Sequence, residues 1–282
     1  MPAARLHDRR LVAWLSLAQL ISWGSVFYLF ALIMAPIERD LGLSRVESSL
    51  AFSLALLAEG LLAYPVGRLI DRGHERRVMT GGSILLGASL MLHSAVTTLA
   101  GFYAVWLGLG IGMAATLYTP VFAVVTRRFP DDFRRAIITM TFLGGLASTV
   151  FIPLSAGLIS NFGWRHALWV LAALHWLVCA PLHCFWLKNA PPQGGSASVS
   201  QPISTTALKD HLQSAPYLLI GLFVVLMMAV TAALPAHMVS LLRENGLSEA
   251  CAQQTPEALG NLHKAEIQKW WPIIKAAGIK QE

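Results

Sequence analysis

The chain has 282 residues, of which 55% are hydrophobic and only 13% are charged. Soluble domains carry roughly a quarter charged residues, so this composition excludes an ordinary soluble domain and predicts an integral membrane protein. The formal net charge of +6 does not indicate nucleic-acid binding, because the basic residues lie in short loops between apolar runs. Two of the three cysteines lie inside one apolar run, which predicts reduced, packed side chains and no disulfide framework.

Seven apolar segments are each close to the ~20 residues that a membrane-spanning helix needs. They fall at residues 11–35, 48–67, 78–98, 101–127, 135–159, 166–187 and 216–242. The first segment follows three arginines, but its apolar stretch is too long for a cleaved signal peptide. We therefore predict an all-α membrane protein whose N-terminus is cytoplasmic.

The basic residues of the loops test this orientation. If the N-terminus is inside, the inner loops carry thirteen Lys and Arg residues and the outer loops carry four. The inner residues are Arg5, Arg9, Arg10, Arg68, Arg72, Arg76, Arg77, Arg127, Arg128, Arg134, Arg135, Lys188 and Lys209, and the outer ones are Arg39, Arg45, Arg165 and Arg243. Their alternation over seven segments predicts a multi-pass protein of the cell (inner) membrane by the positive-inside rule.

The loop between the second and third segments has a distinctive order of glycine, acidic and basic residues. It reads Gly67-Arg-Leu-Ile-Asp71-Arg72-Gly73-His-Glu-Arg76-Arg77. This order resembles the signature loop between helices two and three of the major facilitator superfamily of transporters. In that family the loop latches the two halves of the carrier together in one alternating-access state. The alternative is that the charges only set topology.

Two side chains of this loop have physical roles that can be expected from their chemistry. Gly67 lets helices approach closely, because it has no side chain to separate them. The carboxylate of Asp71 would be stabilised by a helix N-terminus or by a neighbouring guanidinium.

Further motifs extend the resemblance from residue 11 to about residue 250. They are Trp23-Gly24-Ser-Val-Phe27-Tyr28, Leu117-Tyr118-Thr119-Pro120, Arg127-Arg128-Phe129-Pro130, Gly163-Trp164-Arg165 at the turn into helix six, and His237-Met-Val-Ser-Leu-Leu with Gly246-Leu-Ser. They look most like the branch that contains oxalate/formate and monocarboxylate carriers. The family resemblance implies a six-helix bundle in which segments one to three and four to six form nested inverted repeats.

The expected domains follow from this pattern. Residues 1–188 form the six-helix transmembrane bundle, and residues 189–214, which begin with a stretch rich in Pro, Gly, Ser and Thr, form a cytoplasmic linker. Residues 215–250 form a seventh transmembrane helix with its outer loop. Residues 251–282 are polar and form a fused, non-membrane tail outside the cytoplasm.

A few polar groups inside the segments are candidates for transport. Glu59 lies near the middle of the second segment, where an ionisable group needs a partner or a purpose; it carries a proton or lines the substrate path, or it is a packed, hydrogen-bonded glutamate. His237, near the outer end of the seventh segment, is a gate or contact candidate. Tyr28, Tyr118 and Thr119 are cavity candidates by resemblance.

Other patterns have a structural explanation. His175, Cys179 and His183 are spaced at i, i+4 and i+8, which suits zinc, but a polar helix-packing stripe is expected, so no metal and no cofactor are assigned. His93 is expected at the outer interface. Gly108 and Gly112 predict close helix packing. No nucleotide-binding loop or nucleophile–base arrangement is present in the sequence, so an enzyme is not expected.

The tail does not continue the membrane pattern. An eighth segment should begin soon after Ala250, but residues 251–282 are polar and suit a soluble helix capped by Thr255 with Pro256 in its first turn. They resemble the last helix of the periplasmic receptors of tripartite tricarboxylate transporters. The expectation is a truncated carrier with a fusion near residues 250–254.

Three functional hypotheses remain open from the sequence. The first is a secondary transporter for small organic anions. In the carriers that it resembles, basic residues on helices of the second half hold the carboxylate, and this sequence does not contain those helices. Such a transporter would therefore work only if two copies associate through the exposed inner face. The second is a truncated carrier that is inactive alone. The third is a membrane-anchored remnant of a fusion with a periplasmic carboxylate-binding receptor. The expected partners are the lipid bilayer and a small carboxylate substrate.

Overall fold

The computed structural model describes residues 2–129, 132–188 and 214–244, and these residues form helices without any strand. The helices are α1 (Pro2–Ser22), η1 (Trp23–Phe27), α2 (Leu29–Leu41), α3 (Arg45–Asp71), α4 (Glu75–Ser94), α5 (Leu99–Thr116), α6 (Tyr118–Arg128), α7 (Phe133–Gly145), α8 (Ala147–Leu174), η2 (His175–Cys179), α9 (Ala180–Trp186) and α11 (Ala215–Glu244). The elements η1 and η2 are single π-helical turns. The all-α prediction is confirmed.

The helices correspond to the seven predicted segments, several of which are interrupted. In the described part of the chain, four stretches are long and apolar enough to cross a membrane: Arg10–Leu41, Arg45–Asp71, Leu99–Arg128 and Phe133–Trp186. The last has 54 residues, or roughly 80 Å of helix, which is enough for two crossings. It is divided at Gly163, where φ is 78° and ψ is 161°. The sequence prediction of a turn at this glycine is therefore confirmed.

Local chemistry explains where the helices begin and end. Gly42 adopts φ of 66° after α2, the left-handed conformation that commonly ends a helix. Two residues later, Ser44 and Glu47 form a reciprocal capping box that starts α3. At the other end of α3, the amides of Gly73 and His74 donate to the carbonyls of Ile70 and Leu69, and Gly73 has φ of 85°. This is a Schellman turn, and it reverses the chain into α4.

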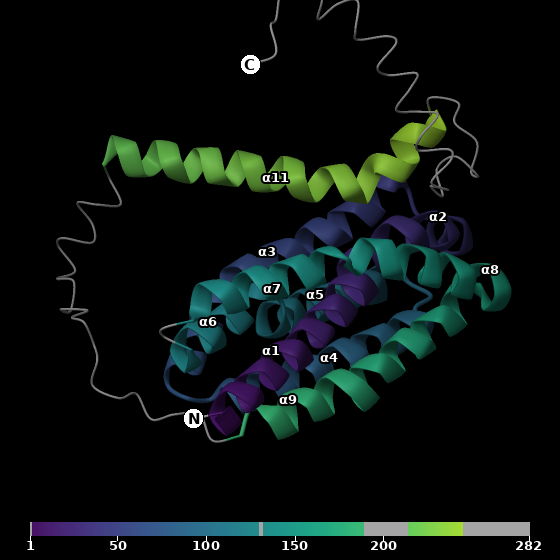
Figure 1. The fold of residues 1–282 in the computed structure, drawn as a ribbon. Coiled ribbons are helices and arrows are strands. Elements are labelled where there is room, and N and C mark those ends of the chain that lie inside the picture. The colour runs from purple at the N-terminus through teal and green to yellow at the C-terminus, as the bar shows by residue number, and fades with distance from the viewer. Residues whose placement is uncertain (1, 130–131, 189–213, 245–282) are drawn as a thin grey trace, which may run out of the picture. The chain divides into compact units, whose positions relative to one another are not determined.

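Helices α3 and α4 both pack against α5 (Figure 1), and glycines make these contacts close. A Cβ atom at Gly110 would lie 2.2 Å from the carbonyl oxygen of Ala55, and one at Gly112 would lie 2.5 Å from the Leu86 side chain. A Cβ at Gly108 would come within 2.7 Å of the Ser89 hydroxyl. The predicted close packing of Gly108 and Gly112 is therefore confirmed.

The interior of the six-segment bundle has two apolar regions. Near the start of α1 and α4, buried residues from several helices form one cluster: Leu11, Leu15, Ile70, Met79, Val121, Val124, Val125, Ala136, Met140 and Leu187. The other region is aromatic, with Phe30 stacked on Phe52 at 4.4 Å and both rings edge-on to Trp106. Both regions hold the interrupted segments in place.

Large apolar side chains also cover the outside of the bundle. On α3, Leu61 and Tyr64 are 70% and 72% exposed, and on α7 Ile138 and Phe142 are 68% and 69% exposed. Patches of this kind mark surfaces that face lipid or another protein.

The chain divides into two compact units, Met1–Ile220 and Gly221–Glu282. The larger unit contains the bundle, and most of α11 belongs to the second unit. The predicted seventh segment, 216–242, falls within this 30-residue helix. The side chain of His237 and the predicted tail, 251–282, lie outside what the structure describes.

Candidate functional site

Four of the predicted transmembrane segments lose regular α-helical geometry partway along. In the first segment the break is η1, and in the sixth it is η2. In the fourth, α5 gives way to α6 at Leu117, whose ψ of −158° is extended. In the fifth, α7 gives way to α8 at Leu146. Irregular backbone inside a membrane protein is tolerated where it is buried in protein or lines a cavity, and π-turns are frequent at functional sites.

The breaks of the first and fourth segments meet at a group of aromatic rings, here called the aromatic cluster: Trp23, Phe27, Tyr28, Tyr118 and Phe122. The ring centroids of Trp23 and Tyr118 lie 4.9 Å apart, and Tyr118 stacks on Phe122 at 5.1 Å. Phe27 contacts Trp23 at 5.1 Å and Tyr28 at 5.5 Å. Each tyrosine adds a hydroxyl group to an otherwise apolar surface.

The fifth segment also reaches this cluster at its break. The Tyr118 hydroxyl donates to the carbonyl oxygen of Thr141 at 3.4 Å. A Cβ atom at Gly144 would lie 2.4 Å from the Tyr118 oxygen, so the glycine is what admits the phenol. Gly24 in η1 has the same role, because a Cβ there would lie 2.1 Å from the Phe151 ring.

The structure separates the predicted transport candidates. Tyr28 and Tyr118 belong to the same cluster and are partly buried, whereas Thr119 is exposed. Glu59 is partly buried on α3, and within the described residues it has no hydrogen bond or ion pair. A carboxyl group in that position is available to a proton or a ligand.

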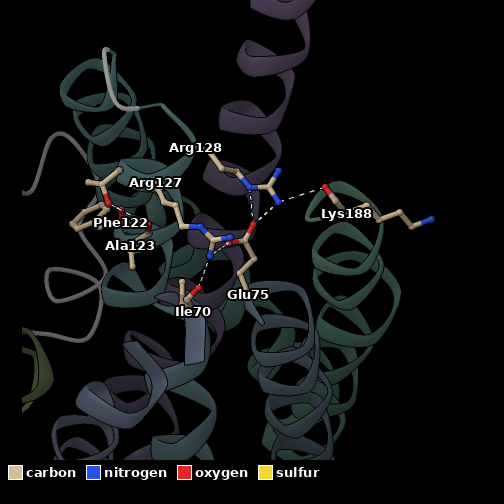
Figure 2. A network of polar contacts seen from close by, with 8 residues as sticks. Ile70, Glu75, Phe122, Ala123, Arg127, Arg128 and Lys188 are labelled. Atoms are coloured by element: carbon tan, nitrogen blue, oxygen red, sulfur yellow. Dashed lines mark hydrogen bonds and ion pairs between the residues drawn. The ribbon is translucent and has the colours of Figure 1, made fainter. Parts of the chain in front are cut away.

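A second site lies at the end of the bundle that we predict to be cytoplasmic. Glu75 is the first residue of α4, and its side chain is fully buried. It forms ion pairs with Arg127 and Arg128, the last two residues of α6, and Arg128 also donates its Nε to Glu75 at 2.7 Å. Figure 2 shows both guanidinium groups directed at the one carboxylate. We call these three residues the charge cluster.

The charge cluster connects three of the predicted inner turns. Arg127 donates to the Ile70 carbonyl oxygen at 2.5 Å, and Arg128 donates to the Lys188 carbonyl oxygen at 3.4 Å (Figure 2). The Schellman turn after α3, the end of α6 and the end of α9 are therefore fastened at one point. The negative charge stands at a helix N-terminus and the positive charges at a helix C-terminus, which is the favourable arrangement for both helix dipoles.

The signature-loop residues lie around this cluster, but they are more exposed than Glu75. Asp71, Arg72, Arg76 and Arg77 are exposed, and Arg76 donates to the Cys184 sulfur at 3.3 Å. A Cβ atom at Gly67 would meet no atom within 4 Å in the described part of the chain. Our expectation that Gly67 allows close helix approach is therefore wrong for this bundle.

The opposite end has its own polar contact. Asp40, from the end of α2, accepts hydrogen bonds from the Trp164 indole at 2.9 Å and from Arg165 at 2.7 Å. The Arg165 guanidinium also lies 4.2 Å from the centre of the Trp164 ring. The predicted outer ends of the first and sixth segments are thereby joined.

Three histidines of the transmembrane segments, His93, His175 and His183, are buried in the protein. His175 and His183 each lie 2.8 Å from a serine hydroxyl of another helix, Ser25 and Ser83 respectively. This supports the packing interpretation, and no group of metal ligands forms among the residues that the structure describes. His93 is fully buried among the rings of Phe102, Trp106 and Trp164. The prediction that His93 is interfacial is wrong, because the chain turns around it and the aromatic region closes over it.

Sequence reasoning missed Glu75 and Ser25. Glu75 was hidden in a run of basic residues, although a lone carboxylate among arginines is a signal for a shared ion pair. Ser25 could not be found from hydrophobic periodicity, because that pattern assumes a regular α-helix and Ser25 lies in a π-turn, which changes the helical register.

The interrupted helices, the apolar exterior and the polar groups at both ends define a multi-pass membrane protein with the architecture of secondary transporters. A sequence profile described as Major Facilitator Superfamily matches residues 15–254. The chain belongs to the Major Facilitator Superfamily. It is therefore not an enzyme, because this superfamily consists of transporters.

Individual relatives agree with this assignment. The multidrug resistance protein MdtL of Escherichia coli O81 (strain ED1a) is 30% identical over 196 residues, which cover 68% of this chain and 48% of MdtL. Monocarboxylate transporter 13 of Rattus norvegicus is 35% identical over 124 residues, which cover 42% of this chain and 28% of that protein. The chain thus spans about half the length of these relatives, or less.

A solved structure shows the same fold. It is the bacterial homologue of the human lysosomal transporter Spinster, in an inward-facing and unoccupied conformation. The TM-score is 0.66 with 15% sequence identity, and the match covers 88% of this chain and 58% of that chain.

Proposed function

We propose that this chain supplies the substrate-binding half of a secondary transporter for small organic anions. The observation that carries the proposal is the meeting of the breaks in the first and fourth segments at the aromatic cluster. These segments occupy corresponding positions in the two predicted inverted repeats, and interrupted helices in corresponding positions are the best indicator of a transporter's binding site.

The chemistry of the cluster suits a small, partly apolar solute. The rings of Trp23 and Phe122 offer apolar contact. The Tyr28 hydroxyl offers a hydrogen-bond donor, and the Tyr118 hydroxyl, which donates to Thr141, offers an acceptor. Within the described residues, no lysine or arginine makes a cation–π contact with a ring of the cluster. In this proposal a carboxylate at the cluster is therefore held by the Tyr28 hydroxyl and by apolar contact rather than by a cation.

Glu59 supplies the coupling step in this proposal. A carboxyl group within a transmembrane helix that has no cation beside it takes up and releases a proton as its access to water changes. Movement of one proton with one carboxylate is electrically neutral, so a pH gradient would drive uptake of the anion.

The second bundle is a second copy of the chain in this proposal, associated through the exposed inner face. The signature-loop residues Asp71, Arg72, Arg76 and Arg77 would then meet the partner bundle and latch it. We also propose that the charge cluster faces the cytoplasm and that residues 251–282 lie outside it. Native sizing in nanodiscs should show a discrete dimer, whereas a homogeneous monomer that transports would contradict this arrangement.

The transport proposal is tested by reconstituting the full chain in proteoliposomes and measuring uptake of radiolabelled L-lactate and oxalate under an inward proton gradient. We expect saturable uptake by the wild type. Glu59→Gln should abolish gradient-driven uptake, and Tyr118→Ala should raise the KM. Glu47→Gln, on an exposed helix cap, is the matched control and should transport normally. Wild-type chain without uptake, or uptake unchanged in both site variants, would refute the proposal.

A second candidate is export of lipophilic cations, which the similarity to MdtL and the unpaired Glu59 favour. Aromatic rings attract cations, and a buried carboxylate neutralises them. Ethidium efflux from the same vesicles separates the two candidates, because only the second predicts ethidium transport that Glu59→Gln removes.

The sequence also left the alternative of a membrane-anchored remnant of a receptor fusion. That function rests on the resemblance of fewer than thirty residues in the tail. It predicts carboxylate binding that survives Tyr118→Ala and Glu59→Gln but is lost when residues 255–282 are deleted, as measured by isothermal titration with tricarboxylates.

A further inference from the structure

The two π-turns of the bundle are joined by one buried hydrogen bond. Nε2 of His175, the first residue of η2, lies 2.8 Å from the hydroxyl oxygen of Ser25 in the middle of η1. Both side chains have no exposed surface, at 0% each. The two residues are 150 positions apart in the chain, so the bond connects the first and the sixth transmembrane segments.

The direction of this bond follows from the other contact of Ser25. The Ser25 hydroxyl has one hydrogen, and it lies 2.6 Å from the Ile21 carbonyl oxygen, which can only accept. The hydroxyl therefore donates to Ile21 and accepts from His175, whose neutral ring carries its proton on Nε2. In this way His175 orients the serine, and the serine bonds to the backbone turn immediately before η1.

A π-turn changes which way the following residues point. One additional residue in a helical turn rotates every later side chain by about 100° relative to an uninterrupted α-helix. Phe27 is the last residue of η1 and Tyr28 follows it, and both belong to the aromatic cluster. The presence of η1 therefore decides whether these rings stand beside Trp23, which contacts Tyr118, or face elsewhere.

The η2 turn is a fixed support for this bond. The Trp176 indole donates to the Ile84 carbonyl oxygen at 3.1 Å, and the same indole packs where Gly87 leaves room for it. His175 is thus held from α4 on one side and reaches η1 on the other.

We infer that His175 is a positioning residue: through Ser25 it holds η1 in its π-helical form and so presents Phe27 and Tyr28 to the substrate path. Its importance for transport rests on the proposed function above, but the geometric part stands apart from it. Among the residues that the structure describes, His175 makes no ring contact with the aromatic cluster, so it acts through Ser25.

The chain contains a matched control for this inference. His183 and Ser83 make a second buried His–Ser hydrogen bond, also 2.8 Å long, between α9 and α4. It has the same chemistry and burial but does not contact η1. Replacing either histidine by leucine removes one buried His–Ser hydrogen bond, so both variants report any general loosening of the bundle.

The first measurement needs no substrate. Tyr28→Cys is introduced as a reporter into a chain in which Cys184 and Cys251 are serine, and its rate of reaction with a water-soluble maleimide is followed in nanodiscs. We expect His175→Leu to change this rate several-fold, His183→Leu to leave it unchanged, and His175→Gln to restore it, because the glutamine amide places an N–H donor close to the position of Nε2. Cys179 is retained in this chain, so the same variants with native Tyr28 are labelled in parallel and their rate is subtracted as the background reaction of Cys179.

The labelling rates decide the inference whatever the chain transports. An unchanged rate in His175→Leu, or equal changes in both leucine variants, would overturn it. If His175→Leu does not reach the membrane, Ser25→Ala removes the same bond from the other side and the same outcomes apply.

Transport is then measured on the chain with its native Tyr28. In the proposed function Phe27 and Tyr28 contact the substrate, so their misplacement weakens substrate binding. We expect His175→Leu to raise the KM for L-lactate by about tenfold at similar maximal rate. A labelling change in a chain whose wild type transports nothing would keep the positioning role of His175 and refute the proposed function alone.

Discussion

Glu75 shows how one side chain determines the structure of a whole end of the bundle. A buried carboxylate is unfavourable unless its charge and its lone pairs are satisfied. Here two guanidinium groups meet it, and each also donates to a backbone carbonyl of a different turn. The carboxylate thus holds both arginines in place, and through them it connects the three predicted inner turns.

Glu75→Gln should therefore strongly destabilise the chain. The substitution keeps the size of the side chain but leaves two buried guanidinium groups without a counter-charge, and breaking a buried pair typically costs about 3–5 kcal/mol. Thermal unfolding in detergent, followed by size-exclusion chromatography, measures the loss.

Glu47→Gln is the control for this prediction, because it replaces a glutamate in an exposed capping box and should cost no more than about 1 kcal/mol. Equal losses in the two variants would show that the Glu75 carboxylate is not held by the two arginines.

At the level of single residues, the sequence named Tyr28, Tyr118 and Thr119 as cavity candidates by resemblance. The structure brings the two tyrosines into the aromatic cluster and leaves Thr119 exposed, and the role of all three in a substrate cavity stays a prediction. His93 lies near the end of its segment, which suggested an interface, but burial depends on aromatic residues of α5 and α8 that periodicity does not place. Gly67 was judged from its residue type alone, without knowledge of which face of α3 it occupies.

Among the elements, the interruptions of the helices carry more information about function than the helices do. Seven apolar segments were visible from hydropathy, and the described helices follow them closely. The π-turns and the break at Leu117 were not predictable, because the apolar pattern continues through them. They arise where glycines such as Gly24 and Gly144, which have no side chain, admit rings from a neighbouring segment.

Glycines at helix contacts lead to a prediction at this scale. Gly110→Ala should destabilise the chain by about 1–3 kcal/mol, because its Cβ would meet the backbone oxygen of Ala55, which cannot move aside like a flexible side chain. Gly67→Ala should be neutral or stabilise by up to about 1 kcal/mol, because the site is open and alanine favours a helix. Thermal unfolding of the two variants tests this pair, and a loss in Gly67→Ala would show that another surface packs against α3.

At the scale of the molecule, the bundle has two chemically distinct ends. The turns predicted to be inner meet at the charge cluster, and the outer ends of the first and sixth segments meet at Asp40. Helices that alternate between these ends reproduce the alternation of the loop charges. The structure thus groups the turns as the sequence predicted, while the side that faces the cytoplasm is still a prediction from the charges.

Cysteine accessibility measures that side. In a chain with Cys184 and Cys251 replaced by serine, Val46→Cys should react with an impermeant maleimide in intact cells, because Val46 is 76% exposed beside a predicted outer turn. Arg77→Cys should react only in inverted membrane vesicles. The reverse pattern would mean that the bundle is inserted with its charge cluster outward.

The pairing of Glu75 also has a consequence for biogenesis. The carboxylate and Arg128 are 53 positions apart, so the second and third segments leave the ribosome well before the arginines that neutralise the charge between them. During that interval the ion pairs of the charge cluster cannot form. We therefore expect the tip of this helical hairpin to reach its final packing only after the fourth segment has been made.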